Sequence, residues 1–118
     1  MTVENIISGA IVSAFSKKLL DNLTLDVAIV GAGPSALVAA KHLAQAGLQV
    51  AIFERKIAPG GGTWGGGMLF NEVVVQSDAL DILDDFGIRH KPVEGAETYH
   101  TLDSVEMASA LIYGAVHA

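Results

Sequence analysis

The sequence has no cysteine among its 118 residues. Disulfide bonds, thiolate metal sites and a cysteine nucleophile are therefore excluded for this chain. A chain without cysteine fits a reducing compartment, and we expect a cytoplasmic protein. Basic residues are also scarce, since seven Lys and Arg stand against 13 Asp and Glu and give a formal net charge of −6. This balance disfavours nucleic acid and anionic membrane surfaces as partners.

Long apolar runs are missing too. No stretch approaches the ~20 apolar residues that a bilayer-spanning helix needs. Glu4 stands where a secretion signal would carry Lys or Arg, so we expect neither a membrane span nor a signal peptide. Apolar residues nevertheless make up 51% of the chain and charged residues 17%. This composition predicts one small folded domain over residues 1–118.

Three segments near the N-terminal third predict a strand, a helix and a second strand. TLDVAIV at 24–30 is apolar and rich in β-branched residues, as strands buried on both faces are. ALVAAKHLAQAG at 36–47 predicts a helix that ends at its last residue, Gly47, and LQVAIFE at 48–54 predicts a second buried strand. The predicted fold class is therefore α/β, with a Rossmann-like parallel βαβ unit of the FAD/NAD-binding type.

An amphipathic helix is predicted ahead of this unit. Thr2 can cap its start, and Lys17 and Lys18 suit its C-terminal end. Its apolar residues follow helical spacing: Val3, Ile6, Ile7, Ala10, Ile11, Ala14 and Phe15.

The second half of the chain carries weaker signals. EVVVQ at 72–76 predicts a strand, and Ser77 is interpreted as the N-cap of a helix that runs to Phe86. Residues 88–100 predict a loop or short edge strands. Asp103 with Glu106 forms the pattern of a capping box before a last helix over 104–116.

The parallel sheet predicted here is incomplete. A doubly wound sheet has five or six strands, and only two parallel strands can be placed with certainty. We therefore expect the chain to correspond to the N-terminal part of a larger dinucleotide-binding domain.

The turn after the first strand carries a dinucleotide-binding fingerprint. In GAGPSA, Gly31 permits a tight turn, Gly33 lets the backbone approach a pyrophosphate, and Ala36 replaces the third glycine, as the fingerprint allows. The following helix offers free N–H groups to an anion, to which Ser35 can add its hydroxyl or which it can merely cap. Glu54, 23 residues after Gly31, can accept hydrogen bonds from ribose hydroxyls. The alternative is a βαβ turn without a ligand.

The acidic residue bears on the choice of nucleotide. Glu54 should repel a 2′-phosphate and so favours NAD or FAD over NADP. Arg55 and Lys56 follow it directly and could reverse this preference, or could form a plain solvated pair.

A cluster of six glycines follows the second strand, in APGGGTWGGGM at 58–68. A flexible linker would carry serine and polar residues. This segment carries Trp64, Met68, Leu69 and Phe70 instead. We therefore expect it to pack at the carboxyl edge of the sheet, where ligands bind in this fold.

Other candidate residues support no site of their own. Asp78, Asp81, Asp84 and Asp85 fit a solvated acidic helix face, and the four histidines, His42, His90, His100 and His117, are scattered without metal-ligand spacing. No metal ligand is predicted, and no catalytic residue can be assigned.

Residues 26–76, DVAIVGAGPSALVAAKHLAQAGLQVAIFERKIAPGGGTWGGGMLFNEVVVQ, closely resemble the N-terminal portion of the thiamine thiazole synthase family. The resemblance is to its archaeal-type members, some of which are also labelled ribose-1,5-bisphosphate isomerase. The preceding helix and LDSVE at 102–106 resemble the family as well. Generic flavoprotein oxidoreductases share the first glycine motif and the Glu-Arg pair but seldom the double glycine triplet.

The resemblance implies a chemistry in which NAD is a co-substrate. Family members release nicotinamide and join the ADP-ribose part to glycine and sulfur, from sulfide or a protein cysteine, with the help of Fe(II). The product is an adenylated carboxythiazole for thiamine biosynthesis. By motif match, Ser35, Glu54, Arg55 and Gly62 would contact NAD. Gly60, Gly61 and the second triplet would shape the site, and the family assembles as a homo-octamer.

The resemblance also has limits. Family members are considerably longer, and their iron ligands, sulfur-donor position and glycine-binding arginine lie beyond the matched segment. Two alternatives therefore stay open: a module that binds NAD or ADP-ribose without turnover, and a fragment of an FAD-dependent oxidoreductase.

Overall fold

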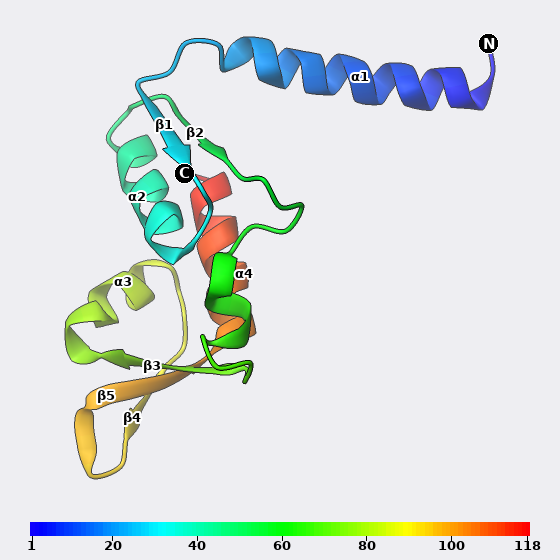
Figure 1. Ribbon diagram of the computed structural model, residues 1–118. Helices are drawn as coiled ribbons and strands as arrows, with labels where there is room; N and C mark the ends of the chain where they lie inside the picture. The colour runs from blue at the N-terminus through cyan, green and yellow to red at the C-terminus, as the bar shows by residue number, and fades with distance from the viewer.

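The computed structural model describes residues 1–118 and contains two small sheets, four α-helices and two short 3₁₀ helices (Figure 1). In chain order the elements are α1 (Val3–Asp21), β1 (Val27–Val30), α2 (Pro34–Gln45), β2 (Val50–Phe53), η1 (Gly61–Gly65), β3 (Glu72–Gln76), η2 (Ser77–Ala79), α3 (Leu80–Asp85), β4 (Lys91–Val93), β5 (Ala96–Asp103) and α4 (Ser104–Val116). None of the helices combines the length and apolar character needed to cross a bilayer.

The βαβ unit is confirmed. β1 and β2 pair in parallel, from Val27 beside Val50 to Val30 beside Phe53, and α2 connects them. α2 starts at Pro34 rather than at residue 36, because proline has a helix-compatible φ and no N–H to lose in the first turn. The α/β fold class predicted from the sequence is therefore correct.

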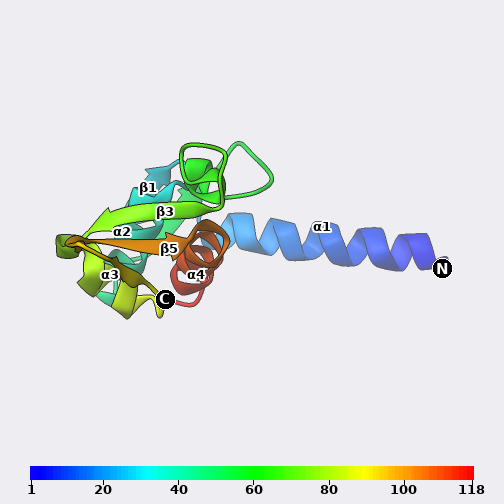
Figure 2. The ribbon, with the colours of Figure 1, turned by 90° about the horizontal axis from the view of Figure 1, so that it is seen from below.

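The N-terminal helix forms, but it is not amphipathic. Thr2 caps α1 by accepting from the backbone N–H of Asn5, whose side chain accepts from the backbone of Thr2 in return. Apolar side chains are not confined to one face, since Val12 and Leu20 lie outside the predicted stripe. No residue of α1 is buried, and the helix projects away from the rest of the molecule (Figures 1 and 2).

The second sheet corrects the prediction for residues 88–100. β3, β5 and β4 form an antiparallel sheet in which β5 is the central strand, paired on both sides. Only β4 is a short edge strand, with Pro92 beside a register shift, as proline requires. β5 extends over eight residues because it alternates side chains between two neighbouring strands, which a single-segment pattern cannot reveal.

Two capping predictions need revision. Ser77 is not an N-cap, because it is the first residue of η2 and α3 begins three residues later. Asp103 does cap α4 by accepting from the N–H of Glu106 at 2.7 Å. The return half of the capping box is absent, because the Glu106 carboxylate accepts instead from the backbone and side chain of Arg89.

The core lies where α2, α4 and α3 meet the inner side of the second sheet. Six buried apolar residues form it: Ala32, Leu37, Leu83, Ile88, Leu102 and Leu111. α2 and α4 pack directly on each other. Because Ala32 belongs to this core, the loop between β1 and α2 is fixed to the rest of the molecule.

Candidate nucleotide site

The turn between β1 and α2 has the geometry that its glycines allow. Gly31 adopts φ of 92°, in the left-handed region that favours glycine, and its N–H donates to the carbonyl of Phe53 at 2.8 Å. Gly33 is the N-cap of α2. Ser35 and Ala36 lie in the first helical turn, where their N–H groups have no acceptor inside the helix. The turn therefore presents the positive end of α2 to the carboxyl edge of the strands.

Glu54 closes this turn from the end of β2. Its Oε2 accepts from the Ala32 N–H at 2.7 Å, and its Oε1 accepts from the Lys56 N–H at 3.2 Å. The hydrogen bonds from the backbone of Lys56 and then of Ala32 hold the pKa of Glu54 below its usual value. A half-buried, ionised carboxylate thus stands beside the first glycines of the fingerprint.

The first glycine triplet folds against the same turn. The Gly60 N–H donates to the carbonyl of Ala32 at 2.8 Å. A Cβ on residue 61 would lie 3.3 Å from the Cα of Gly33, so the two glycine segments are in direct backbone contact. The structure therefore brings together Gly31, Gly33, Glu54 and Gly61, which the sequence analysis had singled out separately.

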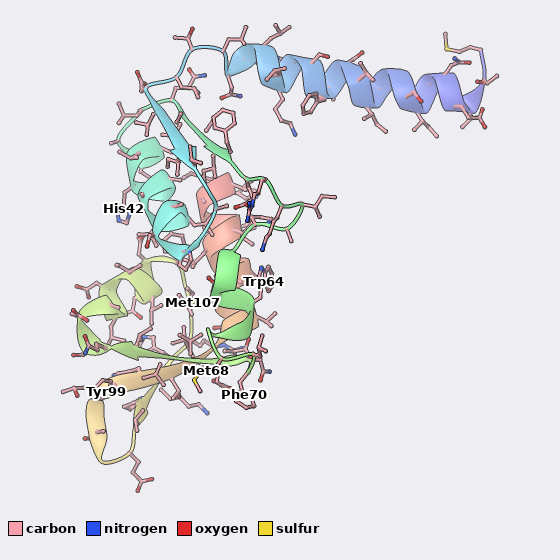
Figure 3. All side chains as sticks on the ribbon, viewed as in Figure 1. His42, Trp64, Met68, Phe70, Tyr99 and Met107 are labelled. Carbon is pink, nitrogen blue, oxygen red and sulfur yellow. The ribbon has the colours of Figure 1, made fainter.

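Trp64 and the buried Ser104 anchor the glycine cluster to α4. Trp64 donates from Nε1 to the carbonyl of Pro59 at 2.8 Å, and its own carbonyl accepts from Ser104 Oγ at 2.7 Å. Residues 61–65 form η1, which packs on α4 beside Trp64 (Figure 3). Met68 and Phe70, in the loop that follows, are exposed. No local pattern pointed to Ser104, because it lies 40 residues from Trp64 in sequence.

Two of the predicted residues are not fixed by the chain itself. Arg55 is exposed and makes none of the hydrogen bonds or ion pairs in the structure. Gly62 is also exposed, and a Cβ at that position would meet no atom within 4 Å. Their side of the site is open to a ligand.

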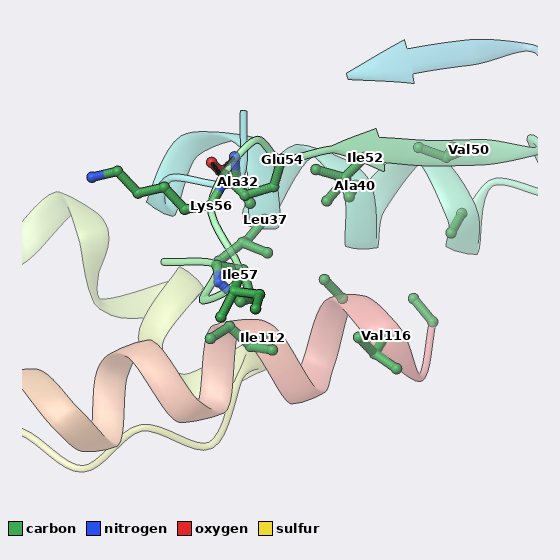
Figure 4. A pocket seen from close by; sticks show the side chains of 14 residues that line it. Ala32, Leu37, Ala40, Val50, Ile52, Glu54, Lys56, Ile57, Ile112 and Val116 are labelled. Atoms are coloured by element: carbon green, nitrogen blue, oxygen red, sulfur yellow. Dashed lines mark hydrogen bonds between the residues drawn. The ribbon is translucent and has the colours of Figure 1, made fainter. Parts of the chain in front are cut away.

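A cavity of about 500 Å³ lies between β2, α2 and the end of α4 (Figure 4). Its floor is mostly apolar and includes Leu37, Ile52 and Ile112, and Glu54 and Lys56 also line it. The contribution of α4 was missed by sequence reasoning, because Ile112 is distant in sequence and carries no motif.

The histidines are not all scattered in space. His90 Nδ1 lies 3.0 Å from His100 Nδ1, and His90 Nε2 lies 2.9 Å from Asp84 Oδ1. This pair corrects the interpretation of His90 and His100 as isolated residues. It forms because the turn before β4 brings His90 beside the central strand β5. No group of three or more His, Asp or Glu residues is placed to hold a metal ion.

A parallel βαβ unit with Gly31 and Gly33 in its first turn and Glu54 at the end of its second strand defines a dinucleotide-binding class of fold. Comparison with known proteins narrows this class, since the sequence model of the Thi4 family matches residues 8–118. The chain belongs to the Thi4 family, as its resemblance to thiamine thiazole synthases predicted.

Individual relatives agree with this assignment. The thiamine thiazole synthase of Methanothermobacter thermautotrophicus is 54% identical over 112 residues, which are 95% of this chain and 43% of that protein. That of Pyrococcus furiosus is 51% identical over 118 residues, or 100% of this chain and 46% of that protein. The crystal structure of Thermovibrio ammonificans THI4 matches with a TM-score of 0.92 and 46% identity, covering 99% of this chain and 44% of that chain. The chain therefore spans less than half the length of these relatives.

Proposed function

We propose that residues 1–118 hold NAD as a co-substrate and form the nucleotide-binding part of a thiamine thiazole synthase. The position of Glu54 carries this proposal. Its carboxylate lies within hydrogen-bond distance of the Ala32 N–H and beside the N-terminus of α2. A carboxylate oxygen has two lone pairs, so each oxygen of Glu54 can accept a ribose hydroxyl in addition to its backbone partner.

The surroundings of Glu54 suit the rest of the nucleotide. The free N–H groups of Ser35 and Ala36 would receive the pyrophosphate at the positive end of α2. The ionised Glu54 disfavours a 2′-phosphate, which supports NAD over NADP. Gly61 and Gly62 would approach the ligand from the opposite side, where exposed Arg55 could add a charge.

The chemistry that we propose for the full assembly follows the family. NAD would lose nicotinamide, and its ADP-ribose part would be joined to glycine and a sulfur source to give an adenylated carboxythiazole in thiamine biosynthesis. Fe(II) would supply Lewis-acid or redox assistance, but the residues present do not fit an iron site, because no suitable group of ligands comes together. We therefore route no step through iron on these residues and propose that its ligands come from other residues.

The proposal also covers setting and assembly. We propose a cytoplasmic enzyme whose other substrates are glycine and a sulfur source, probed most simply with sulfide. We propose a homo-oligomer, supported by the uncovered apolar side chains of α1, such as Ile7, Ile11 and Phe15.

Calorimetric titration of the chain with NAD tests the nucleotide site. Glu54→Gln should weaken binding about tenfold or more, the scale expected for a lost charge-assisted hydrogen bond. Glu94→Gln, an exposed glutamate in the turn before β5, is the matched control and should bind as the parent does. Equal binding by both variants would remove Glu54 from the site.

A second measurement separates turnover from binding alone. The chain is incubated with NAD, glycine, sulfide and Fe(II), and the mixture is analysed by mass spectrometry. Adenylated thiazole supports the synthase. Bound NAD or ADP-ribose without product supports a binding module instead.

A further inference from the structure

We propose that the uncovered face of the β1–β2 sheet binds a polypeptide that carries the part of the Thi4 fold outside the residues matched here. This face, called the open face below, consists of Ala28, Val30, Ala51 and Phe53. The inference rests on the fold and on family membership, and it is independent of whether NAD binds.

The alternation of side chains along the two strands defines the open face. Ile52 packs against the core, so its neighbours Ala51 and Phe53 point to the other side of the sheet. On β1, Val27 and Ile29 are partly buried, whereas Val30 is 89% exposed. α2 and α4 both lie on the side of Ile52 (Figure 4). The open face therefore has no cover within this chain.

Strand register makes the open face a continuous apolar patch. Ala28 lies beside Ala51 and Val30 beside Phe53, so the four side chains form two adjacent cross-strand pairs. None of the four is polar. Phe53 is 51% exposed although it is the largest of them.

The sheet also has two unpaired edges. β1 and β2 pair only with each other, so each strand has one edge with unused backbone groups. Parallel sheets are otherwise covered on both faces, and a pair of strands alone is marginal. VAIV and VAIF carry no charge or proline that would block pairing with a further strand. The surface thus fits a partner that presents apolar side chains to the open face and a strand to a free edge.

The comparison with a solved relative identifies the kind of partner. The T. ammonificans structure reproduces 99% of this chain with a TM-score of 0.92, yet the matched part is 44% of that chain. In that relative the same two strands therefore belong to a larger chain. A polypeptide from its unmatched part is the occupant that we infer for the open face.

The experiment mixes this chain with a separately produced polypeptide that covers the unmatched part of T. ammonificans THI4. Co-elution in size-exclusion chromatography is expected, with slower amide hydrogen exchange over Val27–Val30 in the mixture. Val30→Asp should weaken the association about tenfold or more, because it buries an unpaired charge at the interface. Phe53→Ser, a second substitution in the open face, should weaken it as well.

Val74→Asp is the matched control, since Val74 is a strand valine that is 60% exposed on β3, in the other sheet. It should associate as the parent does. Circular dichroism of each variant alone checks that it folds. Failure to co-elute would overturn the proposal. So would equal effects of Val30→Asp and Val74→Asp, or an open face that is occupied only by a second copy of this chain. NAD titration of the unmixed chain tests the proposed function separately.

Discussion

The carboxylate of Glu54 accepts a 2.7 Å hydrogen bond from the backbone N–H of Ala32, a residue 22 positions earlier in the chain. This bond joins the end of β2 to the turn that begins α2. It fixes an anionic acceptor next to free N–H donors, which is the arrangement that an adenosine ribose and a pyrophosphate require together. The same bond has consequences for stability that can be measured without any ligand.

Stability should depend on pH through Glu54. The folded-state pKa of Glu54 is lowered, first by the Lys56 backbone and then by that of Ala32. A lowered pKa stabilises the fold above the unfolded-state value and loses that contribution as the pH falls through the folded-state value. Urea unfolding of the parent and of Glu54→Gln should therefore differ near pH 7 and converge below about pH 4. A constant difference across this range would contradict the assigned role.

Gly60→Ala should destabilise the glycine cluster. Residue 60 has φ of 118°, which disfavours any side chain, and its Cβ would lie 2.5 Å from Trp64 Nε1. Strain of this kind costs about 1–3 kcal/mol. Thermal unfolding monitored by Trp64 fluorescence measures the loss. Gly62→Ala is the control with open space around its Cβ, and an equal loss there would show that the contact with Trp64 is irrelevant.

Ser104→Ala should loosen η1 from α4. Ser104 is fully buried, and its hydroxyl donates to the Trp64 carbonyl at 2.7 Å. Leaving that carbonyl without its partner should cost about 1–3 kcal/mol in the free energy of unfolding. Ser109→Ala, on the exposed side of the same helix, should have little effect. Similar unfolding curves for Ser104→Ala and the parent would rule out an anchoring function.

Substitutions in α1 should leave the stability of the isolated chain unchanged. Phe15 is exposed on a helix without buried residues, so Phe15→Ser should change the free energy of unfolding by less than about 0.5 kcal/mol. Leu111→Ala, at a core position, should cost about 2–5 kcal/mol. Urea titration of dilute samples makes this comparison. A large loss for Phe15→Ser would show that α1 packs on the molecule or on another copy.

Local signals predicted the βαβ unit and part of its site. The apolar strands, Pro34 and the glycines of GAGPSA act over short stretches, so the sequence pattern sufficed to place them. Glu54 was found because its spacing from Gly31 belongs to a known fingerprint.

Long-range relationships could not be predicted in the same way. The central position of β5, the bond from Ser104 to Trp64 and the pairing of His90 with His100 depend on which segments meet in three dimensions. α1 shows the opposite failure, because its spacing predicted a buried stripe, whereas no surface of this chain meets the helix. A pattern of apolar residues indicates what a helix can bury and leaves open where.

The backbone contact between Gly61 and Gly33 has a consequence for affinity. A loop that closes over a ligand only on binding loses conformational entropy at that moment, and this loss weakens the complex. Here the first glycine triplet already rests on the turn before α2, held by the bond from Gly60 to Ala32. The site is thus organised before a nucleotide arrives, and association should be limited by diffusion and desolvation more than by loop ordering.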